Sequence, residues 1–202
     1  MNALLTLFAL PSTHVQMEPQ QPRPCPSPEN PPLGSSRSCK FHPPPPHVHF
    51  DENPSVFGSI LRGELPSLTL RETQTLLAFE DRSPRAPLHA LVIPKRHIKS
   101  VFNLNADDLY LLQDMHHMAV DLIHSYYPEA AKRHDYILCY HIPPFSSVPH
   151  LHLHVLAPAS EMNWIYRYGK YLVGSRWCAG ELDVRQRLQE GKPAVPYKFW
   201  GC

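Results

Sequence analysis

Apolar residues follow two different periods along the central part of this chain. At 55–64 and 106–126 they recur every three or four positions, which predicts amphipathic helices. Short apolar runs bounded by turn residues predict strands at 68–72, 76–81, 89–94, 136–141 and 150–156. Residues 182–190 predict another helix within a C-terminal extension. Hairpins that alternate with one long helix favour an α+β fold with a mainly antiparallel sheet.

The N-terminal part has a different composition. Residues 17–47 are dominated by Pro, Gln, Ser and Asn, and such a segment buries too little apolar surface to offset its ordering entropy. We therefore predict a disordered segment at 1–50, a folded domain at 51–158 and an extension at 159–202 that packs on the domain. The run Pro43, Pro44, Pro45 and Pro46 is a candidate ligand for a proline-recognition module. An inert tail is the favoured alternative.

Charge and cysteine content exclude several classes of protein. The formal net charge of +1 argues against a protein that coats nucleic acid. The five cysteines are widely spaced and include no CxxC pair, so neither a structural zinc site nor a disulfide framework is indicated. A reducing compartment fits best, which predicts a cytoplasmic protein with the nucleus as a second location. No apolar run approaches the ~20 residues of a membrane span.

Three histidines at alternate positions carry the candidate chemistry. His150, His152 and His154 fall in the last apolar run of the predicted sheet, and alternate residues of a strand share one face. Leu151 and Leu153 belong to the opposite face, which can be buried. The apolar neighbours favour a central strand over a solvent-facing strand that is merely rich in histidine.

Imidazole side chains in this arrangement allow three chemistries. They can bind zinc, although the sequence offers neither a cysteine pair nor an HExxH motif in support. They can act as separate general acids and bases. One histidine can also attack phosphorus and leave again, which splits a difficult displacement into two easier steps.

The histidine strand resembles the signature of a known family. The residues from His150 to Leu156 read His-Leu-His-Leu-His-Val-Leu, which is similar to the histidine-triad motif. Residues 57–66 resemble the opening helix of that family, and residues 77–97 resemble its nucleotide-binding strand, loop and following strand. The similarity covers about residues 53–158. It is greatest to the Hint branch, and within that branch to the Hint3-type adenosine 5'-monophosphoramidases, because of the Pro-Pro-Phe-Ser-Ser-Val-Pro approach to His150.

The resemblance implies a role for each matched residue. His152 is then the nucleophile that attacks the α-phosphate of a purine nucleotide, His154 contacts the phosphate and aids the leaving group, and His150 orients the nucleophile. Asp81 matches the acidic residue that binds the ribose hydroxyls, with a simple turn residue as the alternative interpretation. The remaining matched residues are assigned to the base pocket (Phe57, Ile60 and Phe79), to a phosphate contact (Ser147) and to a fourth histidine near the site (His89).

The base-pocket assignments and that of His89 have plainer alternatives. The base-pocket residues could be ordinary core, and His89 could be a structural histidine. The loop before His150 also lacks the glycine-rich, Asn-containing sequence of many Hint proteins, so a different backbone geometry is expected around the phosphate. No Cys/His set typical of a DNA-binding zinc finger follows residue 158.

The resemblance therefore implies an enzyme that cleaves adenosine 5'-monophosphoramidate to AMP and an amine through a covalent nucleotidyl-histidine. The residues themselves predict no cofactor, no metal site, and no DNA or membrane partner, whereas the resemblance implies a homodimer. A dinucleoside polyphosphate hydrolase is the alternative within the same chemistry. A nucleotide-binding regulatory or scaffold protein with little turnover is the alternative from another class.

Overall fold

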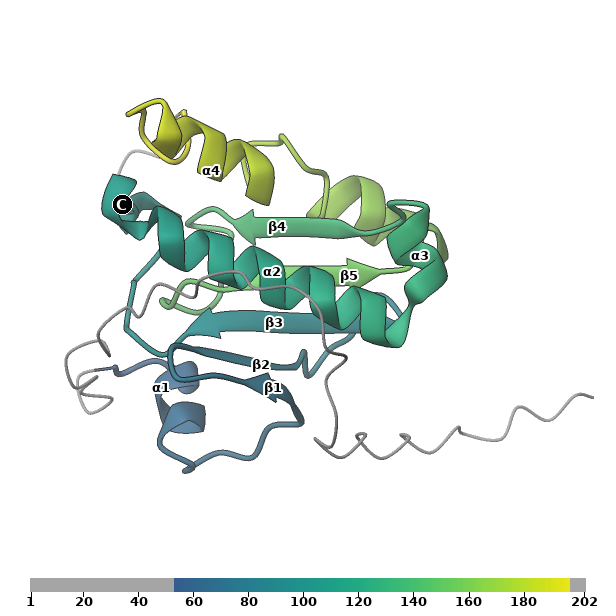
Figure 1. Ribbon diagram of the computed structural model, residues 1–202, viewed down its shortest axis with the longest axis horizontal. Coiled ribbons are helices and arrows are strands. Elements are labelled where there is room, and N and C mark those ends of the chain that lie inside the picture. The colour runs from purple at the N-terminus through teal and green to yellow at the C-terminus, as the bar shows by residue number, and fades with distance from the viewer. Residues whose placement is uncertain (1–52, 197–202) are drawn as a thin grey trace, which may run out of the picture. The chain divides into compact units, whose positions relative to one another are not determined.

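One antiparallel sheet forms the centre of the fold (Figure 1). The computed structural model describes residues 53–196, and within this range six strands lie in the order β1-β2-β3-β5-β4-β6. The strands are β1 Thr69–Glu72, β2 Leu76–Glu80, β3 Leu88–Pro94, β4 Ile137–His141, β5 Leu153–Ala157 and β6 Cys178–Gly180. The predicted tail at 1–50 and its proline run lie outside the described residues.

Helices connect the hairpins of this sheet. They are α1 Val56–Leu61, α2 Leu109–Tyr126, α3 Pro128–Lys132 and α4 Glu181–Gln189. Single turns of 3₁₀-helix occupy Val101–Asn103, Ala106–Asp108 and Ala159–Glu161, and a π-helical turn occupies Tyr166–Lys170. The long helix predicted from residue 106 thus begins as a 3₁₀ turn. The side chain of Asn105 caps that turn together with Asp108, in a reciprocal capping box.

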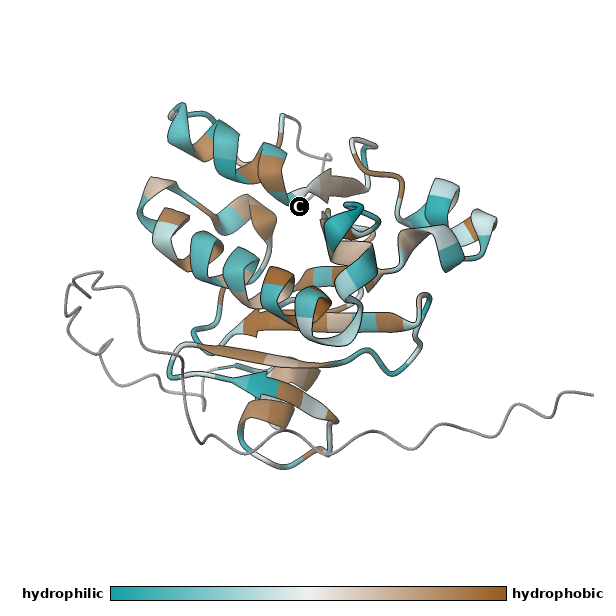
Figure 2. Ribbon diagram, turned by 45° about the vertical axis from the view of Figure 1, so that its right-hand side comes forward, coloured by the Kyte–Doolittle hydropathy of each residue, from teal (hydrophilic) through white to brown (hydrophobic). Residues whose placement is uncertain are grey.

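The long helix α2 covers one face of the sheet (Figure 1). Its buried side chains meet the strand residues that point towards it, which are every second residue of each strand. Figure 2 shows the apolar strands at the centre and a polar outer side of α2. Members of this main core include Leu112, Met115, Ala119, Leu122 and Ile123 of the helix, and Leu151, Leu153 and Val155 of the chain around β5.

The other face of the sheet carries two smaller apolar clusters. One lies on β2 and β3 under α1 and consists of Phe57, Leu77, Phe79, Leu91 and Ile93. The second lies on β4, β5 and β6 and consists of Ala86, Cys139, Leu156, Ala159, Met162, Tyr171 and Cys178. The triad histidines contact both, because the ring of Phe57 lies 5.3 Å from that of His152 and the ring of Tyr171 lies 5.4 Å from that of His154.

The predicted α+β fold is confirmed, with two corrections. Strand β5 begins at Leu153, so only His154 of the triad lies in a strand; His150 and His152 belong to the extended approach, where His150 N–H bonds to the Val148 carbonyl. Because the chain turns at residues 147–150, the backbone of His150 and His152 does not pair with β3 or β4 as a strand would. The sequence also missed α3 and β6, which are too short to show a clear period.

The segment after residue 158 extends this architecture. Strand β6 pairs with β4, and α4 packs on α2, so the extension supplies an edge strand and a helix. Glu181 at the start of α4 is buried and accepts hydrogen bonds from His116 of α2 and from Arg185. The domain boundaries at residues 51 and 158 stay predictions. No helix within residues 53–196 is both long and apolar enough to cross a membrane.

Candidate active site

Five buried histidines meet on the face of the sheet opposite α2. We call them the histidine cluster: His89 from β3, His141 from the end of β4, His150 and His152 from the approach to β5, and His154 from β5. Each ring makes at least one hydrogen bond, and most of these partners can only donate or only accept. The partners fix which nitrogen of each neutral ring carries the proton.

His150 is held from two sides. Its Nε2 lies 2.8 Å from the carbonyl oxygen of Pro94, which can only accept, so Nε2 carries the proton. Its Nδ1 lies 2.7 Å from Nδ2 of Asn53 and accepts from that amide. Asn53 is itself anchored, since its Oδ1 accepts from both the backbone N–H and the hydroxyl of Ser55, the N-cap of α1. Helix α1 is thereby tied to the first histidine of the triad.

His152 has the geometry of a nucleophile. Its Nδ1 donates to the backbone carbonyl of His150 over 2.6 Å, which leaves the lone pair of Nε2 available. The ring packs edge-on against Phe57, with the ring centroids 5.3 Å apart. A neutral imidazole with a fixed, unprotonated Nε2 can attack an electrophilic phosphorus.

His89 sets the tautomer of His154. The backbone N–H of Arg85 donates to Nδ1 of His89 over 3.2 Å, so the proton of His89 lies on Nε2. That Nε2 is 3.0 Å from Nδ1 of His154 and donates to it. The proton of His154 must then lie on its own Nε2, which is buried and has no hydrogen-bond partner among the described residues. A buried donor without a partner is costly, and a phosphate oxygen would satisfy it.

Burial keeps these rings neutral. It lowers the pKa of His89, His141 and His150 to about 4 each, and it lowers the pKa of His152 and His154 below the usual histidine range. The negative charge of Asp81 opposes this effect by raising the pKa of His89 and His152, whereas the positive charge of Lys170 lowers the pKa of both. At neutral pH His152 is therefore unprotonated, as a nucleophile must be.

The residues predicted for the base pocket lie together. Phe57 and Phe79 are buried in one apolar cluster, with ring centroids 5.5 Å apart, and Ile60 packs against it half-buried. Because Phe57 also contacts His150 and His152, this cluster borders the candidate nucleophile. Contact with the base and a plain core role are both compatible with these positions.

The positions of Asp81 and Ser147 give less support to the roles predicted for these two residues. Asp81 Oδ1 accepts from the backbone N–H of Ser83 over 2.8 Å, as the side chain of a turn residue does, while Oδ2 lies 3.5 Å from Nε2 of His89. Ser147 is exposed in the loop before His150, and its side chain makes no hydrogen bond among the described residues. The ribose contact and the phosphate contact stay predictions.

Three further residues complete the site, and sequence reasoning assigned none of them a role. His141 ends a predicted strand near the triad, and in the structure the pairing of β4 with β5 brings its ring to 4.5 Å from that of His154. Asn53 precedes the first predicted helix, and Tyr171 lies in the extension with its hydroxyl 3.5 Å from Nε2 of His89. The sequence carries no signal for these two contacts, because both join segments far apart in the chain.

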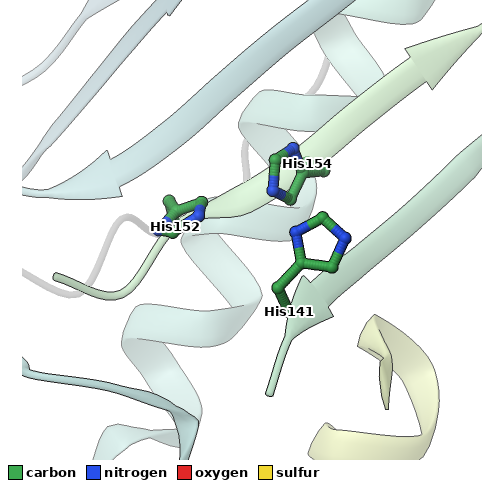
Figure 3. A group of neighbouring side chains, drawn as sticks. All are labelled: His141, His152 and His154. Carbon is green, nitrogen blue, oxygen red and sulfur yellow. The ribbon is translucent and has the colours of Figure 1, made fainter. Parts of the chain in front are cut away.

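Two sets of side chains have the donor geometry of a metal site. One ring nitrogen each from His141, His152 and His154 lies within 4.8 Å of the others, and a second set joins Asp81, His89 and His154 (Figure 3). Imidazole nitrogens and a carboxylate are donors that Zn²⁺ accepts. A cation on the first set would compete for the His152 lone pair if that nitrogen served as a ligand.

Comparison with known proteins decides the family. The family described as "Scavenger mRNA decapping enzyme C-term binding" matches residues 54–168, more than half of the chain, and this range includes the whole histidine cluster. The chain belongs to the histidine-triad superfamily.

The relatives of this histidine-triad protein include Hint3 proteins. Adenosine 5'-monophosphoramidase HINT3 of Danio rerio is 38% identical over 138 residues, covering 68% of this chain and 83% of the relative. The Mus musculus protein of the same name is 32% identical over 152 residues, covering 72% and 85%. Among solved structures, a HIT family hydrolase from Legionella pneumophila has a TM-score of 0.48 and 34% identity, covering 54% of this chain and 96% of that one.

Proposed function

We propose that this histidine-triad protein is a hydrolase that cleaves purine nucleoside phosphoramidates, such as adenosine 5'-monophosphoramidate, to AMP and an amine. One observation carries the proposal: Nδ1 of His152 donates to the His150 carbonyl over 2.6 Å, so that Nε2 presents an unprotonated lone pair. The Hint3 relatives are named for this activity, which supports the choice of substrate.

The reaction proceeds in two displacements at phosphorus. Nε2 of His152 attacks the α-phosphate, the P–N bond of the substrate breaks, and the amine takes up a proton from solvent and leaves. Water then attacks the nucleotidyl-histidine, the bond between phosphorus and Nε2 breaks, and AMP is released. The Nε2–H of His154 stabilises charge on the phosphoryl oxygens in both steps, because it is a buried donor that the described residues leave unpaired.

The neighbouring residues bind the nucleoside in this proposal. Phe57, Ile60 and Phe79 contact the purine, and Asp81 binds the ribose hydroxyls in place of its distant contact to His89. Ser147, in the loop before His150, contacts the phosphate. A homodimer stays a prediction from the family, and light scattering on the purified chain would test it.

The test is hydrolysis of a fluorogenic adenosine phosphoramidate. We expect turnover by the wild-type protein and a loss of at least about 10³-fold in His152→Ala, which removes the nucleophile but leaves the AMP contacts. His124→Ala is the matched control, since His124 is an exposed histidine on α2. A folded wild-type protein that binds AMP without turnover would contradict the hydrolase and favour a regulatory binding role.

Two further measurements distinguish a phosphoramidase from a zinc enzyme and from a hydrolase of dinucleoside polyphosphates. Turnover that resists a strong chelator supports the histidine nucleophile, and turnover that a chelator abolishes and Zn²⁺ restores supports a zinc enzyme. A substrate panel with a diadenosine polyphosphate identifies a dinucleoside polyphosphate hydrolase. Adenosine 5'-phosphosulfate belongs in that panel because a relative in Arabidopsis thaliana, 34% identical over 111 residues, is named for chemistry on that compound.

A further inference from the structure

His141 stands beside the triad although the triad motif does not include it. It is the last residue of β4, whose neighbour β5 carries His154, and its buried ring lies 4.5 Å from that of His154. Figure 3 shows His141 and His154 on adjacent strands, with a nitrogen of each turned towards the space next to His152.

The tautomer of His141 follows from one hydrogen bond. Its Nε2 lies 3.2 Å from the backbone carbonyl of Lys170, which can only accept, so Nε2 carries the proton. Burial lowers the pKa of His141 to about 4, and the ring is neutral at pH 7. Its Nδ1 therefore presents a lone pair.

Few such lone pairs exist in the histidine cluster. The Nδ1 lone pairs of three other rings are accounted for: His150 accepts from Asn53, His154 accepts from His89, and His89 accepts from the Arg85 backbone. Nδ1 of His152 carries its proton. Within the described residues, the hydrogen bonds thus leave two lone pairs in the cluster unoccupied, on Nε2 of His152 and on Nδ1 of His141.

The second half of the proposed reaction needs a proton acceptor. When water attacks the nucleotidyl-histidine, Nε2 of His152 is bonded to phosphorus until the displacement is complete. His154 cannot accept, because its Nε2 already carries a proton and its Nδ1 is occupied. Of the two lone pairs, only that of His141 is available at this moment.

The spacing suits a single water molecule. One ring nitrogen of each of His141, His152 and His154 lies within 4.8 Å of the others. A water that hydrogen-bonds a donor and an acceptor at ordinary lengths spans roughly 4.5–5 Å between them. In the same group of rings, Nε2–H of His154 is a donor without a partner among the described residues, and Nδ1 of His141 has an unoccupied lone pair.

We propose that His141 is the general base for hydrolysis of the nucleotidyl-His152 intermediate, an inference that rests on the proposed function. Water donates a proton to Nδ1 of His141 as its oxygen bonds to phosphorus. The bond between phosphorus and Nε2 of His152 breaks, and its electron pair returns to Nε2. The His141 imidazolium, still donating from Nε2 to Lys170, then loses the added proton to solvent.

The C-terminal extension positions this base. The carbonyl that holds His141 belongs to Lys170, and the next residue, Tyr171, is buried with its ring 5.1 Å from that of His141. The indole N–H of Trp177 donates to the carbonyl of Gly169 over 2.9 Å and secures the same turn. Residues beyond the triad motif therefore determine the orientation of a catalytic group.

The experiment separates the two half-reactions. We would mix excess fluorogenic adenosine phosphoramidate with the full chain, follow amine release in the stopped flow, and measure the intact mass after acid-free quenching. His141→Ala and His141→Gln are compared with wild type and with His124→Ala. Thermal unfolding shows that each variant is folded.

We expect both His141 variants to release one amine per active site at close to the wild-type rate. Their steady-state turnover should then fall by about 10²-fold or more, the usual contribution of a general base, while protein carrying one adenylyl group on His152 accumulates. Added imidazole should partly restore turnover in His141→Ala, because it can occupy the vacated space.

Two results overturn the inference. Equal losses in the burst and in the steady state would make His141 a structural or binding residue, and unchanged turnover would show that it has no role. If the wild type itself neither turns over nor forms the adenylyl-histidine, the proposed function fails first. The two failures are therefore distinguishable in one data set.

Discussion

The side-chain amide of Asn53 donates to Nδ1 of His150 over 2.7 Å, across 97 residues of sequence. This bond joins a residue that precedes α1 to the start of the triad. It also fixes the ring of His150, whose backbone carbonyl in turn holds His152. The orientation of the candidate nucleophile therefore depends on a residue outside the motif.

Replacing Asn53 should reduce activity although Asn53 lies outside the triad motif. In Asn53→Ala, Nδ1 of His150 stays buried without a donor, which costs about 1–3 kcal/mol of stability. We expect kcat/KM to fall about tenfold or more, measured with the fluorogenic phosphoramidate at a temperature where the variant is folded. Asn103→Ala, at an exposed position away from the cluster, is the control; equal losses in both variants would count against the prediction.

Gly58 allows the approach of Asn53 to α1. A Cβ atom at this position would lie 2.1 Å from the backbone oxygen of Asn53 and 2.8 Å from its Cγ, so the chain must shift. We expect Gly58→Ala to lower the free energy of unfolding by about 1–3 kcal/mol, as for other overpacked sites, and to reduce turnover. Gly169→Ala is a matched control in which a Cβ meets nothing within 4 Å; denaturant unfolding of both variants measures the difference.

His89 acts through the tautomer of His154. In His89→Phe, Nδ1 of His154 loses its donor, and the proton of His154 is no longer held on Nε2. We expect kcat/KM to fall about 10- to 100-fold, equivalent to about 1.4–2.8 kcal/mol of transition-state stabilisation. His89→Gln keeps an amide donor and should retain more activity than His89→Phe. Identical activities in the two variants would show that this donor has no effect.

The stability of the protein should fall in mild acid. Burial lowers the pKa of His89, His141 and His150 to about 4, against the usual value near 6.5. Between these two values the unfolded chain binds protons that the folded chain excludes, so the stability present above pH 6.5 is lost as the pH falls towards 4.

Thermal unfolding from pH 8 to pH 4.5 measures this effect. Each excluded proton contributes about 1.4 kcal/mol per pH unit. We expect a steeper decline below pH 6.5 in the wild type than in His141→Gln, which lacks one of these groups. Parallel curves would mean that His141 is not buried in its neutral form.

Local patterns in the sequence were enough to predict the main elements and the motif. The helical period at 106–126 and the apolar runs predicted α2 and the antiparallel sheet, because burial of one face imposes the same spacing on any chain that folds this way. The alternation of histidine and leucine at 150–154 also separated the site face from the core face correctly. Leu151 and Leu153 are in the main core, and the histidines lie on the opposite side.

The remaining parts of the site depend on contacts between distant segments of the chain. His141 meets His154 through strand pairing, Asn53 meets His150 through the entry to α1, and Lys170 and Tyr171 meet His141 through the extension. These contacts join residues that no local period connects. Each contact nevertheless fixes the orientation of a histidine ring or the nitrogen that carries its proton. This follows because the tautomer of a buried imidazole depends on the donors and acceptors that the fold brings next to it.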